Sequence, residues 1–396
     1  MSELRLDAIH QGLSQRMTRW ADVDPWLVGL TVVLSLLGWL MVTSASIDIL
    51  SQSSGNGLGM MRRHGFFLGL SALAWGAVML CSVQLWYRFS ALLLAVATVG
   101  LLAVFVPGLG VTVNGATRWL NFQLFNVQPS EVLKLALVVY LAAYLQRRQD
   151  EVRTSWMGFI KPILMTGGFA VLLLAQPDFG AVVIILMTMM VMMFLGGVRL
   201  GQFIVALAVV SGAAALVAVT QAYRVQRLLT FMDPWSSENV FNSGYQLTQA
   251  LIAFGRGEWF GVGLGNSLQK LFYLPEAHTD FITAVIAEEF GLVGLSLMLL
   301  AYAILIGRML WVGWQAERQG ALFAGYICYG VAVIFSLQVF INVGVNAGLL
   351  PTKGLTLPLI SYGGSSLVIN FVMLALVTRI ALALRHHESQ ALGGAQ

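Results

Sequence analysis

The segment FGAVVIILMTMMVMMFLGGV, residues 179–198, contains no Asp, Glu, Lys or Arg. A helix needs about 20 mostly apolar residues to cross the hydrocarbon of a bilayer, so this segment predicts a membrane-spanning helix. The composition of the whole chain agrees, because 58% of its 396 residues are hydrophobic and only 10% are charged. A soluble domain carries about 25% charged residues. The sequence therefore predicts an integral membrane protein and excludes a soluble globular one.

Charge-free segments of similar length recur along the chain. They cover residues 26–47, 64–87, 89–117, 179–198, 200–223, 290–307, 319–352 and 354–378, and segments 130–146 and 159–177 are nearly as apolar. The apolar runs are continuous, which favours helices over the alternating pattern of barrel strands. We expect an all-α integral membrane protein in which ten helices form a transmembrane bundle.

The distribution of Lys and Arg predicts the orientation of this bundle. With the N-terminus inside, ten helices place thirteen of the 22 basic residues in the cytoplasm. Both termini are then cytoplasmic, with residues 1–24 as an N-terminal segment, 25–385 as the membrane domain and 386–396 as a tail. Apolar residues at helical spacing within 1–24 indicate a helix on the inner membrane surface. A disordered tail is the alternative for that segment.

Residues 221–279 interrupt the pattern between the seventh and eighth predicted helices and lie outside in this orientation. Loops this long are usually functional or disordered, and this one has too many Phe, Trp, Tyr and Leu residues for disorder. We expect a large ordered extracytoplasmic cap. Its glycines at 255, 257, 261, 263 and 265 resemble a phosphate-binding fingerprint, but no strand precedes them, so no nucleotide site is expected. The chain also carries no nucleic-acid-binding signature.

Several blocks of the sequence carry polar residues in a distinctive order. In chain order they are GATRW (115–119) with QPSE (128–131), QPDFG (176–180), YLPEAHTDFI (273–282) with AEEFG (287–291), and GLLP (348–351) through ISYGGSS (360–366). Their residues and order resemble the signature of the SEDS family, the polytopic proteins that build the bacterial cell wall. Ala277, residues 266–270 and the basic N-terminal extension are more similar to the cell-division branch of that family than to its elongation branch.

The resemblance implies a ten-helix fold and a peptidoglycan glycosyltransferase that polymerises lipid II. The enzyme would work at the outer face of the cytoplasmic (inner) membrane, at the division septum. The resemblance also implies partners: a class B penicillin-binding protein, which is an FtsI-like transpeptidase, and other division membrane proteins of the FtsQ, FtsL and FtsB type. Two other functions stay open, a lipid II flippase and a noncatalytic division scaffold.

Polymerising a lipid-diphosphate sugar requires an acceptor hydroxyl to attack an anomeric carbon while a diphosphate leaves. The diphosphate is a stable anion, so one base and a cationic clamp suffice, unlike in glycoside hydrolysis. Asp280 is the candidate base, because it lies at the predicted outer start of the eighth helix and the family motif centres on it. Alternatively, it stabilises the positive helix end, with Thr279 as N-cap. Glu276 and His278 flank it and could orient the base, bind sugar or be structural.

Arg118 is the preferred candidate for binding the diphosphate, because guanidinium binds phosphate oxygens through a rigid fork. Lys353, in an outer segment punctuated by Pro and Gly, is a second candidate, and both side chains could instead snorkel to lipid headgroups. Pro351, Pro358, Gly363 and Gly364 indicate a broken or re-entrant path around Lys353. Asp178 could cap the sixth helix or line a cavity or cation site.

Two further pairs of charged residues fall within predicted helices. Glu131 and Lys134 stand one turn apart, so they can neutralise each other or contact the substrate. Glu288 and Glu289 lie deeper along the eighth helix, where ionisable groups usually have a partner, and Glu288 is also a candidate for substrate contact. No His or Cys cluster indicates a resident metal or other built-in cofactor, although a divalent cation (Mg or Mn) could bridge the diphosphate.

Overall fold

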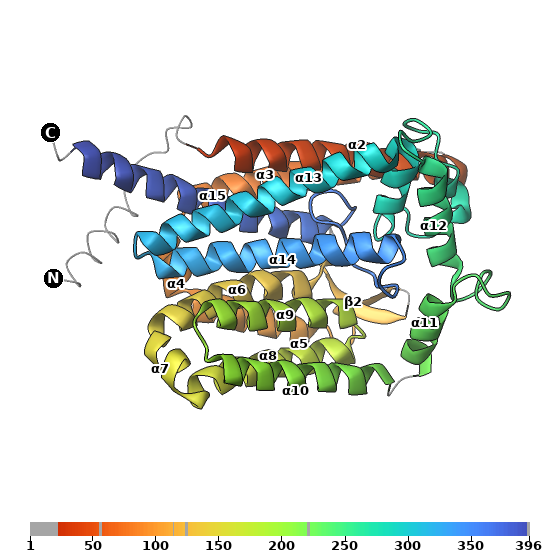
Figure 1. Ribbon diagram of the computed structural model, residues 1–396. Helices are drawn as coiled ribbons and strands as arrows, with labels where there is room; N and C mark the ends of the chain where they lie inside the picture. The colour runs from red at the N-terminus through yellow and green to blue at the C-terminus, as the bar shows by residue number, and fades with distance from the viewer. Residues whose placement is uncertain (1–22, 55–57, 114, 123–125, 220–221, 394–396) are drawn as a thin grey trace.

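The computed structural model describes residues 23–54, 58–113, 115–122, 126–219 and 222–393. Long helices dominate and run side by side through most of the molecule (Figure 1). In chain order the long helices are α2 (Pro25–Ser54), α3 (Gly59–Leu80), α5 (Ser90–Ala103), α6 (Pro129–Arg147), α8 (Trp156–Ala175), α9 (Phe179–Leu195), α10 (Leu200–Val219), α13 (Ile282–Arg318), α14 (Leu322–Asn346) and α15 (Gly364–Gly393). Short helices α4 (Val83–Arg88) and α7 (Gln149–Thr154) connect them. The surface helix predicted within residues 1–24 lies outside the described residues, apart from its last two positions.

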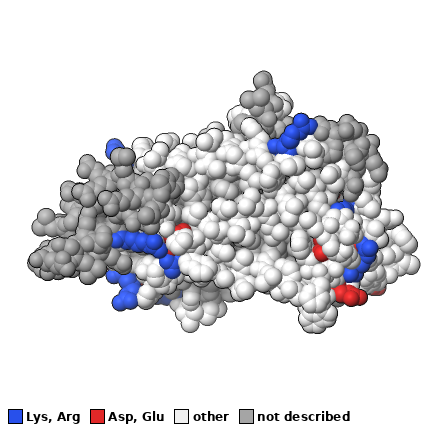
Figure 2. Space-filling model, turned by 90° about the horizontal axis from the view of Figure 1, so that it is seen from above, with Lys and Arg blue, Asp and Glu red and all other residues white. Residues whose placement is uncertain are grey.

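Within the described residues, six helices are long and apolar enough to cross a membrane: α2, α3, α8, α13, α14 and α15. Three more apolar helices, α5, α9 and the first part of α10, are shorter. The face shown in Figure 2 carries its visible Lys, Arg, Asp and Glu side chains toward its two ends, with an uncharged zone between them. Such a zone is what the hydrocarbon of a bilayer requires. The prediction of a multi-pass helical membrane protein is confirmed.

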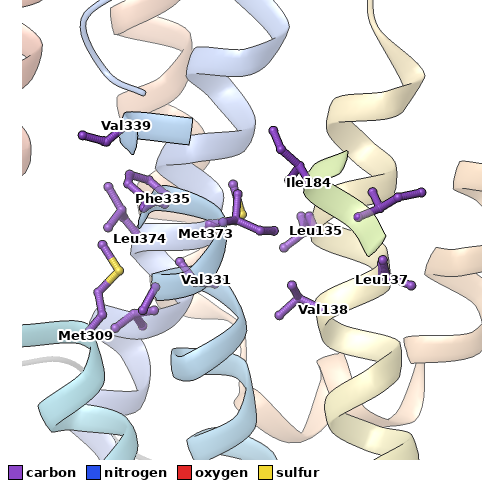
Figure 3. Packing of buried hydrophobic residues seen from close by; sticks show 14 of the residues in the cluster. Leu135, Leu137, Val138, Ile184, Met309, Val331, Phe335, Val339, Met373 and Leu374 are labelled. Carbon is purple, nitrogen blue, oxygen red and sulfur yellow. The ribbon is translucent and has the colours of Figure 1, made fainter. Parts of the chain in front are cut away.

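The centre of the bundle is a continuous apolar core. Helix α6 is buried along most of its length and packs against α5, α9 and α14. In Figure 3, Leu135 and Val138 of α6 lie near Ile184 of α9, while Phe335 of α14 lies in a cluster with Leu374 of α15. Because protein surrounds α6, its charged residues Glu131 and Lys134 are buried among other helices and not exposed to lipid.

A small antiparallel sheet corrects the expectation of a purely α-helical protein. Its strands are β1 (Gly110–Val113), β2 (Ala116–Asn121) and β3 (Asn126–Val127), in the order β1-β2-β3. The predicted span 89–117 is therefore wrong beyond Ala103. The absence of charge could not locate the end of that helix, whereas Pro107 and the glycines after it favour a break there.

The predicted span 354–378 also begins too early, because α15 starts only at Gly364. The preceding residues 351–363 contain no helix, and several of them are buried against protein. This confirms the irregular path that the Pro and Gly residues of this segment predicted. Irregular backbone at membrane depth is tolerated where it is buried in protein or lines a cavity.

The segment predicted as a cap contains two helices, α11 (Ala222–Met232) and α12 (Tyr245–Gly257), and a π-helical turn η2 (Gln269–Tyr273). Both helices lie across one end of the bundle (Figure 1). The chain then enters α13, which is broken at Gly291, where φ is 67° and ψ is −168°. Only glycine adopts this backbone conformation readily.

Backbone from the cap fits into the break in α13. The amides of Val262 and Gly263 donate to the carbonyls of Glu288 and Glu289, at 2.9 and 3.1 Å. In return, the amide of Leu292 donates to the carbonyl of Glu258 at 2.9 Å. The broken helix thus satisfies its backbone groups through the cap, which explains why the break is stable.

Candidate functional site

The structure contains a cavity of about 1290 Å³ at the end of the bundle that carries the cap. Its wall is formed by α3, β2, α6, α9, α11, the residues before α13 and the irregular segment 351–363. The charged residues that line it are Arg62, Arg63, Arg118, Glu131, Lys134, Asp178, Arg227, Glu276, Asp280 and Lys353. Seven of the nine predicted site residues lie in this wall, and His278 and Glu288 do not.

Asp280 lies just before α13 and does not cap it. The helix begins at Ile282, and its N-cap position is held by Phe281 without a side-chain hydrogen bond. The prediction that Thr279 caps the helix is wrong, because its hydroxyl donates to the Glu276 carboxylate at 2.7 Å. The carboxylate of Asp280 is half-buried in the wall of the cavity.

The surroundings of Asp280 change its acidity. The pKa of Asp280 is raised to about 7, mainly by burial and also by Glu276 and Asp178, whereas Arg118 lowers it. The backbone of Gly354 lies against the carboxylate, since a Cβ at Gly354 would stand 2.8 Å from Oδ2 of Asp280. A carboxylate with a pKa near 7 can accept a proton from a hydroxyl group at neutral pH.

Arg118 extends from β2 into the wall of the cavity. Its Nε donates to the carbonyl of Gln176 at 3.2 Å, and its Nη2 donates to the carbonyl of Pro177. These carbonyls follow the end of α8, where the negative end of the helix dipole favours a cation. The guanidinium is therefore held by protein backbone next to the cavity, a position that suits an anion site better than a lipid-headgroup anchor.

Asp178 joins two helices at the floor of the cavity. One carboxylate oxygen accepts from the amide of Ala181 at 3.3 Å, which confirms that Asp178 caps α9. The other oxygen accepts from the side chains of Gln128 and Ser130, each at 3.3 Å, at the start of α6. Asp178 thus fixes the start of α6 relative to α9.

The predicted ion pair between Lys134 and Glu131 is confirmed, with a separation of 2.7 Å. Both residues are buried and line the cavity. Lys353 also lines the cavity, and its ammonium group lies 4.2 Å from the centre of the Phe179 ring, a cation–π contact.

Three cavity-lining arginines were not predicted as site residues. Arg62 and Arg63 belong to α3, and Arg227 belongs to α11. In the sequence, two adjacent arginines just before a charge-free span indicate the end of that span, but they belong to no motif. Arg227 lies in the cap, and nothing in the sequence indicates which side of the cap faces the bundle.

His278 contributes to the site through its backbone and its ring. Its carbonyl accepts from the amide of Tyr362 at 3.0 Å, and the two rings lie 6.0 Å apart. Burial lowers the pKa of His278, so the imidazole is neutral at pH 7. These contacts fix the loop before Asp280 to the irregular segment and favour the structural interpretation of His278.

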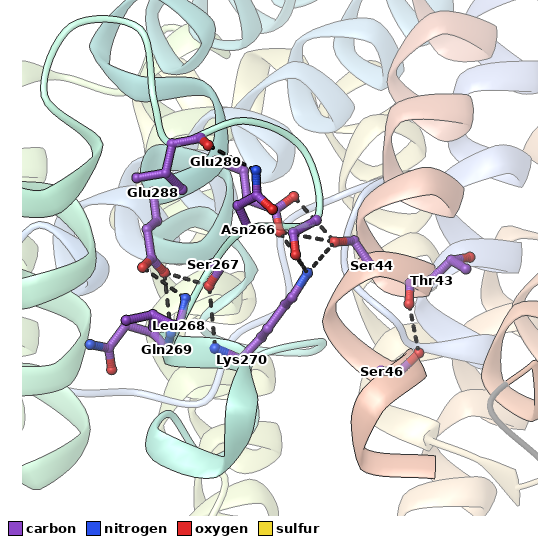
Figure 4. Close-up of polar contacts among 12 residues, drawn as sticks. Thr43, Ser44, Ser46, Asn266, Ser267, Leu268, Gln269, Lys270, Glu288 and Glu289 are labelled. Atoms are coloured by element: carbon purple, nitrogen blue, oxygen red, sulfur yellow. Dashed lines mark hydrogen bonds and ion pairs between the residues drawn. The ribbon is translucent and has the colours of Figure 1, made fainter. Parts of the chain in front are cut away.

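Glu288 and Glu289 are buried and have polar partners, as their depth predicted (Figure 4). Glu288 pairs with Arg256 at 2.6 Å and also accepts from the amide of Leu268. Glu289 pairs with Lys270 at 3.0 Å. Together these contacts attach the cap to α13, and they place Glu288 in a structural cluster outside the cavity wall.

Comparison with known proteins gives a consistent result. Residues 25–386 match the family of cell cycle proteins that comprises FtsW, RodA and SpoVE. The "Probable peptidoglycan glycosyltransferase FtsW" of Hahella chejuensis is 50% identical over 397 residues, covering 100% of this chain and 96% of the relative. The protein with the same description from Pseudomonas fluorescens is 50% identical over 370 residues, covering 93% of this chain and 90% of that protein.

Solved structures share the fold. A chain described under "Structural coordination of polymerization and crosslinking by a peptidoglycan synthase complex" is 28% identical and has a TM-score of 0.73, with 93% of this chain and 99% of that chain covered. The rod shape determining protein RodA of Thermus thermophilus is 26% identical, with a TM-score of 0.67 and coverages of 92% and 98%. The similarity extends over nearly the whole length of each protein.

Proposed function

The chain belongs to the family of FtsW, RodA and SpoVE cell cycle proteins, and from this premise we propose that it is a peptidoglycan glycosyltransferase that polymerises lipid II. One observation supports this most directly. The cavity combines a carboxylate whose pKa is about 7 with arginine and lysine side chains contributed by separate elements. This is the combination that transfer of a sugar from a lipid diphosphate requires.

We propose Asp280 as the general base of this reaction. Its carboxylate takes the proton from the acceptor hydroxyl as the hydroxyl oxygen bonds to the anomeric carbon of the donor sugar. The bond between that carbon and the diphosphate oxygen breaks, and the diphosphate leaves as an anion. Arg118 and Lys353 face the same cavity and stabilise this charge. Lys134 already pairs with Glu131, so both residues serve mainly to shape the cavity floor.

A divalent cation would enter this site with the substrate. Within the described ranges, no group of three His, Cys, Asp or Glu residues is placed to bind a metal ion. Mg²⁺ is commonly held by substrate phosphates together with one or two carboxylates. Asp178 and Glu276 are the carboxylates of the cavity wall that could take part.

Polymerisation of lipid II placed in the outer leaflet of a vesicle tests the proposed enzyme. We expect glycan strands from the chain together with a class B penicillin-binding protein, and much slower formation of them by an Asp280→Asn chain. Movement of lipid II across the bilayer without polymer would indicate a flippase. Normal assembly with neither activity would indicate a scaffold.

We further propose that this penicillin-binding partner is an FtsI-like transpeptidase and that full activity depends on it. The similar chain in a peptidoglycan synthase complex supports such a partner. Other division proteins of the FtsQ, FtsL and FtsB type would then join the assembly at the septum. Unchanged polymerisation when the partner is omitted would contradict the dependence.

The protein's topology follows from the same premise. We propose that α5, α6, α9 and α10 complete a set of ten spanning helices, with the cap outside and residues 1–24 and 386–396 in the cytoplasm. Ser237 lies exposed in the cap, so a Ser237→Cys variant should react with a membrane-impermeant thiol reagent in intact spheroplasts. Labelling only after permeabilisation would reverse the orientation.

Replacing Arg118 with Lys distinguishes an anion clamp from a headgroup anchor. The substitution keeps the charge but loses the fork, and it removes the two backbone hydrogen bonds that hold the guanidinium. We expect polymerisation to fall about tenfold or more, since bonds to a charged group contribute about 1.5–3 kcal/mol. Near-normal turnover by Arg118→Lys would favour the anchor.

The rate of polymerisation should depend on the ionisation of Asp280. The pKa of Asp280 is raised to about 7, so the base is ionised above that pH and protonated below it. We expect kcat/KM, which reports the pKa of the enzyme without substrate, to level off above about pH 7 and to fall about tenfold per unit on the acidic side. A rate that stays constant down to pH 5 would exclude a base with this pKa.

A further inference from the structure

We propose that Asn342 and Asn346 of α14 are positioning residues, which hold the main chain of Asp280 and the neighbouring cavity wall in a fixed relation. The inference rests on the proposed function, because it concerns the base of that reaction. Neither asparagine lines the cavity. They act on the site through the backbone of Asp280.

The two amide side chains converge on one carbonyl oxygen. Nδ2 of Asn342 and Nδ2 of Asn346 each donate to the carbonyl of Asp280 at 3.0 Å. Nδ2 of Asn342 also donates to the carbonyl of Leu355 at 2.6 Å. Asn342 therefore connects the residue that carries the base with the irregular segment 351–363, whose Gly354 lies against the Asp280 carboxylate.

Neighbouring groups fix the orientation of both amides. The hydroxyl of Thr283 donates to Oδ1 of Asn342 at 2.6 Å, and the amide of Ala284 donates to Oδ1 of Asn346 at 3.2 Å. Backbone carbonyls only accept and backbone amides only donate, so a flipped Asn346 would lose its bonds at both ends. A flipped Asn342 would lose its bonds to the carbonyls of Asp280 and Leu355. Both asparagines are almost fully buried, and an unsatisfied group at this depth is costly.

This arrangement has a direct consequence for the base. Asp280 precedes the first turn of α13, so the hydrogen bonds of the helix do not hold it, and its carbonyl relies on α14. The carboxylate packs against Gly354, which is the residue before Leu355. The hydrogen bonds that Asn342 donates to the carbonyls of Asp280 and Leu355 therefore set both the position of the carboxylate and how closely it packs against Gly354. Reacting groups that shift by about 1 Å can lose 10²-fold in rate.

Loss of the hydrogen bonds from Asn342 should also change the environment of the Asp280 carboxylate. The charged groups that face Asp280 are Glu276, Asp178 and Arg118, and burial is the largest influence on its acidity. If the wall at Gly354 separates from Asp280, water reaches the carboxylate and stabilises its ionised form. The acidic limb of the pH–rate profile then moves to lower pH, an effect that a loss of folded protein does not produce.

The experiment compares variants of the full chain in complex with its penicillin-binding partner, using lipid II as substrate. Asn342→Ala removes the hydrogen bonds to Asp280 and Leu355, and Thr283→Val removes only the hydroxyl that orients the Asn342 amide. Gln338→Leu is the matched control, because Gln338 is a buried amide one turn earlier on α14 whose polar atoms have no hydrogen-bond partner within the described residues.

For Asn342→Ala we expect a fall in kcat of about tenfold to a hundredfold and little change in KM. The acidic limb of its pH–rate profile should lie at lower pH than that of the parent. Thr283→Val should show the same shift with a smaller loss of rate, and it decides the question if Asn342→Ala does not fold. Gln338→Leu should match the parent in both measurements.

Two results would overturn the inference. If Thr283→Val and a folded Asn342→Ala keep the parental kcat and pH profile, the asparagines do not position the base. If Gln338→Leu reproduces the changes, they arise from any buried polar substitution on α14. Failure of the parent chain to polymerise lipid II would instead reject the proposed function, and the inference with it.

Discussion

An Asp280→Asn variant should polymerise lipid II at least about a hundredfold more slowly than the parent, because removing a general base costs roughly 10² to 10⁴ in rate. Asparagine is nearly isosteric with aspartate but cannot accept the proton. The carbonyl of Asp280 keeps its bonds to α14, so the fold and the binding of lipid II should be retained. Single-turnover polymerisation, with lipid II binding measured separately, checks this expectation.

A neighbouring carboxylate provides the control for this variant. Glu276 lies in the same cavity wall and raises the pKa of Asp280. Glu276→Gln should therefore retain most of the activity at pH 8 and move the acidic limb to lower pH. If Asp280→Asn polymerises at the parental rate and Glu276→Gln does not, the base is Glu276 and the assignment to Asp280 is wrong.

Much of the fold could be predicted because the bilayer imposes a simple rule on composition. Charge-free length identified the helices, but it could not locate their ends. The run 89–117 includes α5, β1 and the start of β2, because strands and helices can both be uncharged. Only Pro107 and the glycines after it indicate a break in this run. Helix α6 was predicted despite Glu131 and Lys134, because the rest of segment 130–146 is apolar and long enough to cross a membrane.

The sequence predicted the site residues that stand in motifs, but not the residues that influence the site only by holding its backbone. Asp280 and Arg118 lie in recognisable blocks, and the structure places both in one cavity. Asn342 and Asn346 lie in an apolar run that the sequence indicates only as a spanning helix. Their role depends on which carbonyls stand opposite them, and that follows from tertiary packing rather than from spacing.

The glycines of the cap illustrate the same limit. Their pattern suggested a phosphate-binding fingerprint, which the sequence context excluded, but it did not reveal their purpose. In the structure they allow two backbones to approach closely. A Cβ at Gly257 would stand 1.9 Å from the carbonyl oxygen of Ala287, and a Cβ at Gly261 would stand 2.2 Å from that of Glu289. No side chain fits between the cap and the broken helix at these two positions.

Gly261→Ala should therefore detach the cap from α13 and abolish polymerisation. The methyl group would overlap with main-chain atoms at a φ of +79°, which adds about 1–3 kcal/mol for overpacking and about 1–2 kcal/mol for the left-handed conformation. Detachment would also expose the buried carboxylates of Glu288 and Glu289 and release the loop that leads to Asp280. Gly255→Ala is the matched control, because a Cβ at Gly255 in α12 meets no atom within 4 Å and alanine favours a helix. Thermal unfolding of the purified complex and its polymerisation rate should separate the two variants, with Gly255→Ala at or above the parental stability. Equal stability and activity of Gly261→Ala and Gly255→Ala would show that the cap does not depend on this close approach.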